Sequence, residues 1–84
     1  IKPGTKVADV VADPTSGYPA DVALTTATAG AIIRYSFTET PSTIASGTEY
    51  TGLITVPSDP TTIYAKAFLT GYQASDAFSA TYTT

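Results

Sequence analysis

A chain of 84 residues that carries four basic and seven acidic side chains, and neither Cys nor His, supports few kinds of chemistry. Without Cys it forms no disulfide and binds no metal through thiolates. The basic residues Lys2, Lys6, Arg34 and Lys66 are scattered, so they form no phosphate-neutralising cluster and we expect no nucleic-acid partner. No apolar run approaches the roughly 20 residues that span a bilayer, so we expect no membrane insertion.

The length is that of one domain, residues 1–84, with a modest core. Residues 1–6 contain Pro3 and Gly4 and are predicted to form a linker that leads into the domain. Because the chain starts at Ile1 and contains no Met, we expect it to be a segment of a larger protein.

The first half of the chain predicts three strands, at residues 7–12, 20–27 and 31–38. The third is the clearest, because apolar and polar side chains alternate along it. Its apolar face consists of Ala31, Ile33, Tyr35 and Phe37. Only residues 28–30 separate the second and third strands, so we expect these two strands to pair as a hairpin.

The second half predicts a surface loop followed by three or four more strands. Residues 39–47 are polar and contain a proline, which is typical of a loop. A short strand or strand pair, interrupted near Gly52, follows at residues 50–56. Residues 61–70 predict the second long strand, and residues 77–83 predict the last one.

Six or seven short strands with turn signals every 8–12 residues or so favour an all-β fold. We predict an immunoglobulin-like antiparallel β-sandwich, because a parallel sheet needs crossover helices that the sequence does not contain. A small barrel is the main structural alternative. The predicted core residues are Leu24, Ile33, Tyr35, Ile63, Ala65, Phe78 and Tyr82.

A set of short segments follows in a fixed order along residues 14–83. It consists of Gly17-Tyr18, Val22-Ala23-Leu24-Thr25, Ala31-Ile32-Ile33-Arg34-Tyr35-Ser36, Pro41-Ser42, Tyr50-Thr51-Gly52-Leu53-Ile54, Ile63-Tyr64-Ala65-Lys66-Ala67, Gly71-Tyr72-Gln73-Ala74-Ser75 and Ala80-Thr81-Tyr82. With these segments in this order, the chain resembles the chitobiase/β-hexosaminidase C-terminal domain family. No single segment is specific, whereas the ordered set is.

This resemblance implies an immunoglobulin-like accessory module of bacterial secreted glycoside hydrolases and surface proteins, with no catalytic residues of its own. It therefore implies an extracellular or cell-surface location and an association with carbohydrate metabolism. One departure stands out, because members of the family usually place Asp-Gly after the strand that corresponds to residues 31–38. Here Thr38 and Glu39 occupy those positions, so we expect a wider turn.

The residues offer little for catalysis or metal binding. Glu39 and Glu49 flank one loop and are the only carboxylate pair worth considering for glycosidase chemistry, which needs two carboxyls held roughly 5–10 Å apart. We predict no enzyme activity, no catalytic residues and no cofactor. Calcium would require several oxygen ligands, and only Asp9 with Asp13, or Asp59 near Asp76, are candidates. We expect these carboxylates to be solvated turn residues, with Asp13 and Asp59 bonding nearby backbone amides, and no metal site.

The best candidate contact surface is the predicted outer face of residues 61–70. It carries Tyr64, Lys66 and Phe68, and Arg34 is predicted to lie on a similar outer face. The leading hypothesis is a non-catalytic spacer that orients or packs against neighbouring domains of the same polypeptide, as a monomer. The alternative is a module that binds a glycan or a surface protein through the 39–49 loop or the Tyr64/Phe68 face.

Overall fold

The computed structural model describes residues 5–84, which contain seven strands and no helix. Most of the linker predicted at residues 1–6 therefore lies outside the described residues. The strands are β1 (Val11–Asp13), β2 (Asp21–Thr25), β3 (Ile32–Ser36), β4 (Thr48–Glu49), β5 (Ile54–Thr55), β6 (Thr61–Phe68) and β7 (Phe78–Tyr82).

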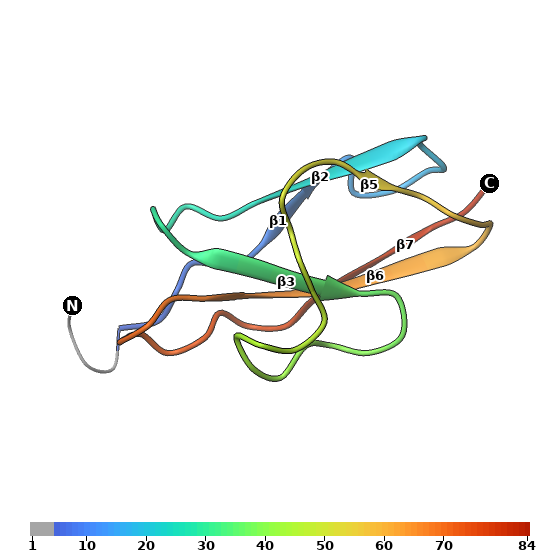
Figure 1. The fold of residues 1–84 in the computed structure, drawn as a ribbon. Helices are drawn as coiled ribbons and strands as arrows, with labels where there is room; N and C mark the ends of the chain where they lie inside the picture. The colour runs from blue at the N-terminus through green and yellow to red at the C-terminus, as the bar shows by residue number, and fades with distance from the viewer. Residues whose placement is uncertain (1–4) are drawn as a thin grey trace.

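The strands form two facing sheets (Figure 1). One has the order β1-β2-β5 and the other has the order β4-β3-β6-β7. Every pair of named strands is antiparallel. Two separate sheets packed face to face confirm the immunoglobulin-like β-sandwich and contradict the barrel alternative.

The first part of the chain contacts both sheets in turn. Residue Lys6 forms an isolated parallel bridge with Gln73, just before β7, and the Val7 N–H donates to the Gln73 carbonyl (2.9 Å). The Ala8 N–H then donates to the Thr28 hydroxyl (2.8 Å), and β1 pairs with β2. The predicted strand at residues 7–12 is therefore interrupted, because Val7 bonds beside the larger sheet whereas Ala8 and β1 bond to the smaller sheet.

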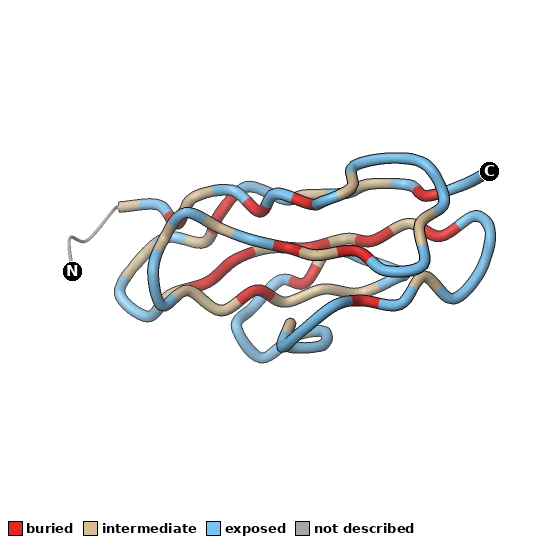
Figure 2. The backbone as a smooth tube through the Cα atoms, turned by 90° about the horizontal axis from the view of Figure 1, so that it is seen from above, coloured by how far each residue is buried: buried red, intermediate tan, exposed pale blue. Residues whose placement is uncertain are grey.

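Alternation places the core between the two sheets. Along β6, Ile63, Ala65 and Ala67 are fully buried, because odd-numbered side chains point at the opposite sheet. The buried cluster consists of Val7, Val10, Ala12, Val22, Leu24, Ile33, Ile54, Ile63, Ala65, Ala67 and Tyr82. Figure 2 shows the buried positions gathered along the strands, while most of the connecting turns are exposed.

Most predicted core residues lie in or against this cluster. Leu24, Ile33, Ile63, Ala65 and Tyr82 are buried members, as predicted. Tyr35 and Phe78 are only half-buried and pack against the cluster from its margin.

The prediction that the second and third strands pair as a hairpin is wrong. Strand β2 pairs with β1 and β5, whereas β3 pairs with β4 and β6 in the other sheet. The connection at residues 26–31 crosses between the layers, and Gly30 takes a left-handed conformation there (φ 80°). Each strand has one apolar face, and splitting the two strands between the layers lets those faces cover each other.

Only β5 falls within the short strand or strand pair predicted at residues 50–56, because β4 already ends at Glu49. Strand β4 pairs with β3, while β5 pairs with β2 in the opposite sheet. The interruption near Gly52 is therefore the crossing between layers, which starts where the Tyr50 N–H donates to the Ile33 carbonyl (2.7 Å). A long loop, residues 37–47, separates β3 from its partner β4, as the polar stretch at residues 39–47 predicted.

Candidate functional site

The outer face of the four-stranded sheet carries the predicted contact residues. The register places Arg34 opposite Lys66 and Ser36 opposite Tyr64. Tyr64 and Lys66 are half-buried and lie on this outer face, as expected from alternation.

Phe68 does not belong to an exposed patch. It lies at the end of β6, opposite the half-buried Ile32, and only 8% of it is exposed. It also lies outside the buried cluster between the sheets. The prediction of an exposed Phe68 is therefore wrong, because apolar side chains opposite each other on one sheet face shield one another from water.

Arg34 fastens the long loop to this face. Its Nε donates to the Ile44 carbonyl (2.6 Å) and its Nη1 donates to the Gly47 carbonyl (3.5 Å). The loop, residues 37–47, leaves β3 and folds back along the sheet (Figure 1). Arg34 is thus an anchor for the loop, a role that sequence reasoning missed because backbone carbonyl acceptors leave no signal in the sequence.

Gly47 permits the close return of the loop. It has a left-handed conformation (φ 69°), and a Cβ at this position would lie 2.7 Å from the Tyr35 carbonyl oxygen. A side chain here would collide with backbone that has no room to move. The loop tip is closed by the Ser46 N–H, which donates to the Thr43 carbonyl (2.9 Å), and it presents Ile44 with 38% exposure.

Three aromatic rings meet where β3 ends. Tyr35 makes edge-to-face contacts with Phe37 (centroids 6.0 Å apart) and with Tyr50 (6.4 Å). Phe37 is 40% exposed, whereas Tyr35 and Tyr50 are half-buried. Phe37 is therefore the member of this group whose ring is open to solvent.

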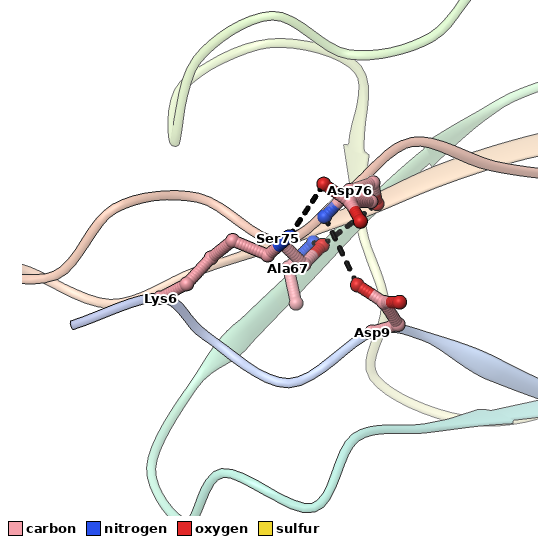
Figure 3. A network of polar contacts seen from close by, with 5 residues as sticks. All are labelled: Lys6, Asp9, Ala67, Ser75 and Asp76. Carbon is pink, nitrogen blue, oxygen red and sulfur yellow. Dashed lines mark hydrogen bonds and ion pairs between the residues drawn. The ribbon is translucent and has the colours of Figure 1, made fainter.

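A polar network ties the beginning of the described chain to the segment before β7 (Figure 3). Lys6 Nζ forms an ion pair with Asp76 Oδ1 (2.6 Å), and the Asp76 N–H donates to Asp9 Oδ1 (3.1 Å). The hydrogen bond to Asp76 raises the pKa of Lys6. Both ionic side chains are exposed, so the pair positions the chain and contributes little stability.

Ser75 completes this network from the buried side. Its Oγ accepts a hydrogen bond from the Ala67 N–H (2.8 Å) and donates one to the Asp76 carbonyl (3.1 Å). The Ser75 hydroxyl thus replaces a backbone carbonyl as the acceptor for the Ala67 N–H, beyond the last residue pair of β6 and β7. Nothing local in the sequence marks Ser75 or the Lys6–Asp76 pair, because the partners are brought together only by folding.

The two carboxylate groupings considered for calcium do not form. Asp9 meets Asp76 rather than Asp13, and Asp59 lies beyond the opposite end of β7 from Asp76. Within residues 5–84 no three acidic side chains gather closely enough to hold a metal ion. Asp59 instead accepts hydrogen bonds from Thr83 and Thr84, and those bonds lower its pKa.

Glu39 and Glu49 do not face a cleft. Both are exposed, Glu39 in the loop and Glu49 on β4 opposite Arg34. No pocket is found in the part of the chain that the structure describes. The described residues likewise include no helix suited to crossing a membrane.

The outer face of the smaller sheet carries two exposed apolar residues. Val11 on β1 is 58% exposed and Leu53, next to β5, is 66% exposed. They lie on either side of β2, where the half-buried Ala23 pairs with Asp13.

Comparison with known proteins identifies the family. Neither the curated proteins nor the solved structures include a match to this chain. The family described as the chitobiase/β-hexosaminidase C-terminal domain matches residues 12–83, nearly the whole described sandwich. The chain therefore belongs to the chitobiase/β-hexosaminidase C-terminal domain family, a family of accessory domains.

Proposed function

We propose that this chain is a non-catalytic spacer that orients neighbouring domains of a larger bacterial extracellular or cell-surface protein. Family membership supports an accessory role. The extracellular setting rests on the same membership, since the family is found in secreted bacterial glycoside hydrolases. The lack of His and Cys leaves carboxylates as the main candidates for acid–base chemistry.

The observation that carries the proposal is the path of the chain along the long axis. The molecule measures 42 × 20 × 19 Å. Residues 5–7 lie at one end, beside Gln73, and Thr83 and Thr84 lie at the other end, beside Asp59 (Figure 1). Domains attached before and after this one would be held apart in line.

The two ends are also firmly attached to the sandwich. The Gln73 N–H donates to the Thr5 carbonyl (2.8 Å), and the Thr83 N–H donates to the Gly17 carbonyl (2.8 Å). Such bonds limit pivoting at the points where the chain enters and leaves the domain. A spacer needs this, because loose ends would transmit no orientation.

Small-angle X-ray scattering on two copies joined directly end to end tests this proposal. A spacer predicts a maximum dimension close to twice the 42 Å long axis. The control is the same pair joined by a flexible Gly/Ser linker, which should give a broader distribution of distances. A compact particle, no longer than a single copy, would contradict the proposal.

The second candidate function is a contact module that uses the Arg34-anchored loop. The favouring observation is that Ile44 at the loop tip and Phe37 at the loop start are both exposed while the loop is held in place. A glycan array and a protein-binding screen with the chain, compared with Phe37→Ala and Ile44→Ala, test this candidate. Binding that both substitutions leave unchanged would rule out the loop.

A further inference from the structure

Of the four sheet edges, the edge of β7 is the least protected. Edge strands usually avoid pairing with other chains by being short or by carrying charges or proline. Strands β4 and β5 have two residues each, and β1 has three and ends at Asp13, just before a proline. Strand β7 has five residues, Phe78–Tyr82, with neither charge nor proline.

The direction of the free backbone groups follows from the hydrogen-bond pattern. The Ser75 N–H donates to the Ala67 carbonyl, so the odd-numbered residues of β6 bond toward β7. Their partners Phe78 and Ala80 therefore point their backbone groups at β6. Ser79 and Thr81 point theirs outward, in the same direction as the Thr83 N–H, which reaches the Gly17 carbonyl.

The rest of the chain covers this edge only at its ends. Before β7, residues 5–7 pair at Gln73, and the Asp9 carboxylate accepts a hydrogen bond from the Asp76 N–H. The backbone itself turns away at Ala8, which bonds to Thr26 and Thr28 on the far side of the core. After β7, Gly17 covers Thr83. Within residues 5–84, the outward backbone groups of Ser79 and Thr81 have no backbone partner from another segment.

We propose that this edge pairs with β7 of a second copy of the chain, antiparallel and centred on Ala80. In that register Ser79 of each copy faces Thr81 of the other. Both residues present an outward N–H and an outward carbonyl, so each such pair exchanges two hydrogen bonds. The edge is thus complementary to itself about a twofold axis. Pairing would join the four-stranded sheet of one copy to the four-stranded sheet of the other as one continuous sheet.

The side chains suit this register as well as the backbone does. Ser79 and Thr81 are small and uncharged, and Ser–Thr pairs opposite each other can bond through their hydroxyls. On the inner face, the half-buried Phe78 of one copy would lie opposite Tyr82 of the other and lose further exposure to water. Residues 77–84 contain no charge, so the contact brings no like charges together despite the net charge of −3.

The pairing is weak, because a five-residue edge buries less than the roughly 1,000 Å² of a stable interface. We expect a dissociation constant on the order of 0.1–1 mM. A weak dimer of this kind departs from the monomer expected from the sequence. The pairing matters most where copies are held close together, at effective concentrations of about the mM range.

Sedimentation velocity over a concentration series from micromolar to millimolar tests the pairing. The wild type should form dimers at the upper end. The double variant Ser79→Lys/Thr81→Lys places lysine against lysine and should weaken the dimer by about tenfold or more. The matched variant Ser79→Lys/Thr81→Glu places lysine against glutamate and should restore it.

Amide hydrogen exchange on the wild type gives a second readout that does not depend on any variant. Exchange at Ser79 and Thr81 should slow as the protein concentration rises, while exchange at Ala80 stays unchanged because its N–H already bonds within the sheet. A monomer at all concentrations overturns the proposal. So does a dimer that both charge variants leave intact, or that forms without protection at these two amides.

Discussion

Tyr82 joins the last strand to the first turn, and replacing it with Phe isolates one buried hydrogen bond. Its side chain is fully buried, and its hydroxyl donates to the Pro14 carbonyl (2.6 Å). Tyr82→Phe keeps the ring in the core and removes only this bond. We expect the free energy of unfolding to fall by about 1–2 kcal/mol at neutral pH, because the Pro14 carbonyl loses a partner that water replaces incompletely.

The pH dependence of this difference provides a sharper test. Burial raises the pKa of Tyr82 above its usual value. The unfolded chain then loses the phenolic proton first, at about pH 10. The stability of the wild type therefore falls as the pH rises from there through the folded pKa, by up to about 1.4 kcal/mol per pH unit from this group. Tyr82→Phe has no phenolic proton to lose, so its stability does not fall in this way. The difference in the free energy of unfolding between the two proteins should therefore narrow above about pH 10.

Urea unfolding followed by circular dichroism at neutral and alkaline pH measures both effects. Tyr18→Phe is the matched control, since Tyr18 is exposed in a turn and its replacement should change stability by less than about 0.5 kcal/mol. If Tyr82→Phe costs no more than this control, or if the gap stays constant into alkaline pH, the reasoning about the buried hydroxyl is refuted.

Two further predictions concern the ends of β7. Ser75→Ala removes the acceptor of the buried Ala67 N–H and should lower the free energy of unfolding by about 1–3 kcal/mol, against a change below about 0.5 kcal/mol for Ser16→Ala in an exposed turn. Equal urea midpoints for the two variants would contradict this. Hydrogen bonds from Thr84 and Thr83 lower the pKa of Asp59. The stabilisation of the folded protein by the ionised Asp59 is therefore present above the pKa of the unfolded chain and is lost as the pH falls through the pKa of the folded one. Asp59→Asn should therefore flatten the acid limb of the stability curve, below about pH 4, and an unchanged limb would show that these bonds do not form in solution.

The positions of the strands were predictable because alternation is a local property. The apolar face through Ile33 and the one through Ile63 and Ala65 follow directly from period-two patterning, and these residues are buried as expected. The turns that bound the strands were equally readable from glycine and proline. The ordered segments also indicated the family that the comparison confirms over residues 12–83.

The candidate surface was predicted less well, because exposure depends on what covers a face. Alternation correctly placed Tyr64 and Lys66 outside the core. It could not show that Phe68 is shielded, or that the loop returns across Arg34. Both depend on contacts between segments far apart in the sequence.

Patterning along the chain determined which residues are strands, which of their faces are apolar, and hence that two sheets must cover each other. Only the tertiary structure decided which strand pairs with which. A short connection such as residues 28–30 is compatible with either a hairpin or a crossing between layers, and the choice depends on the summed burial of all the strands. The same is true of the free edge of β7, which exists because the first segment of the chain leaves that edge at Ala8 to complete the other sheet.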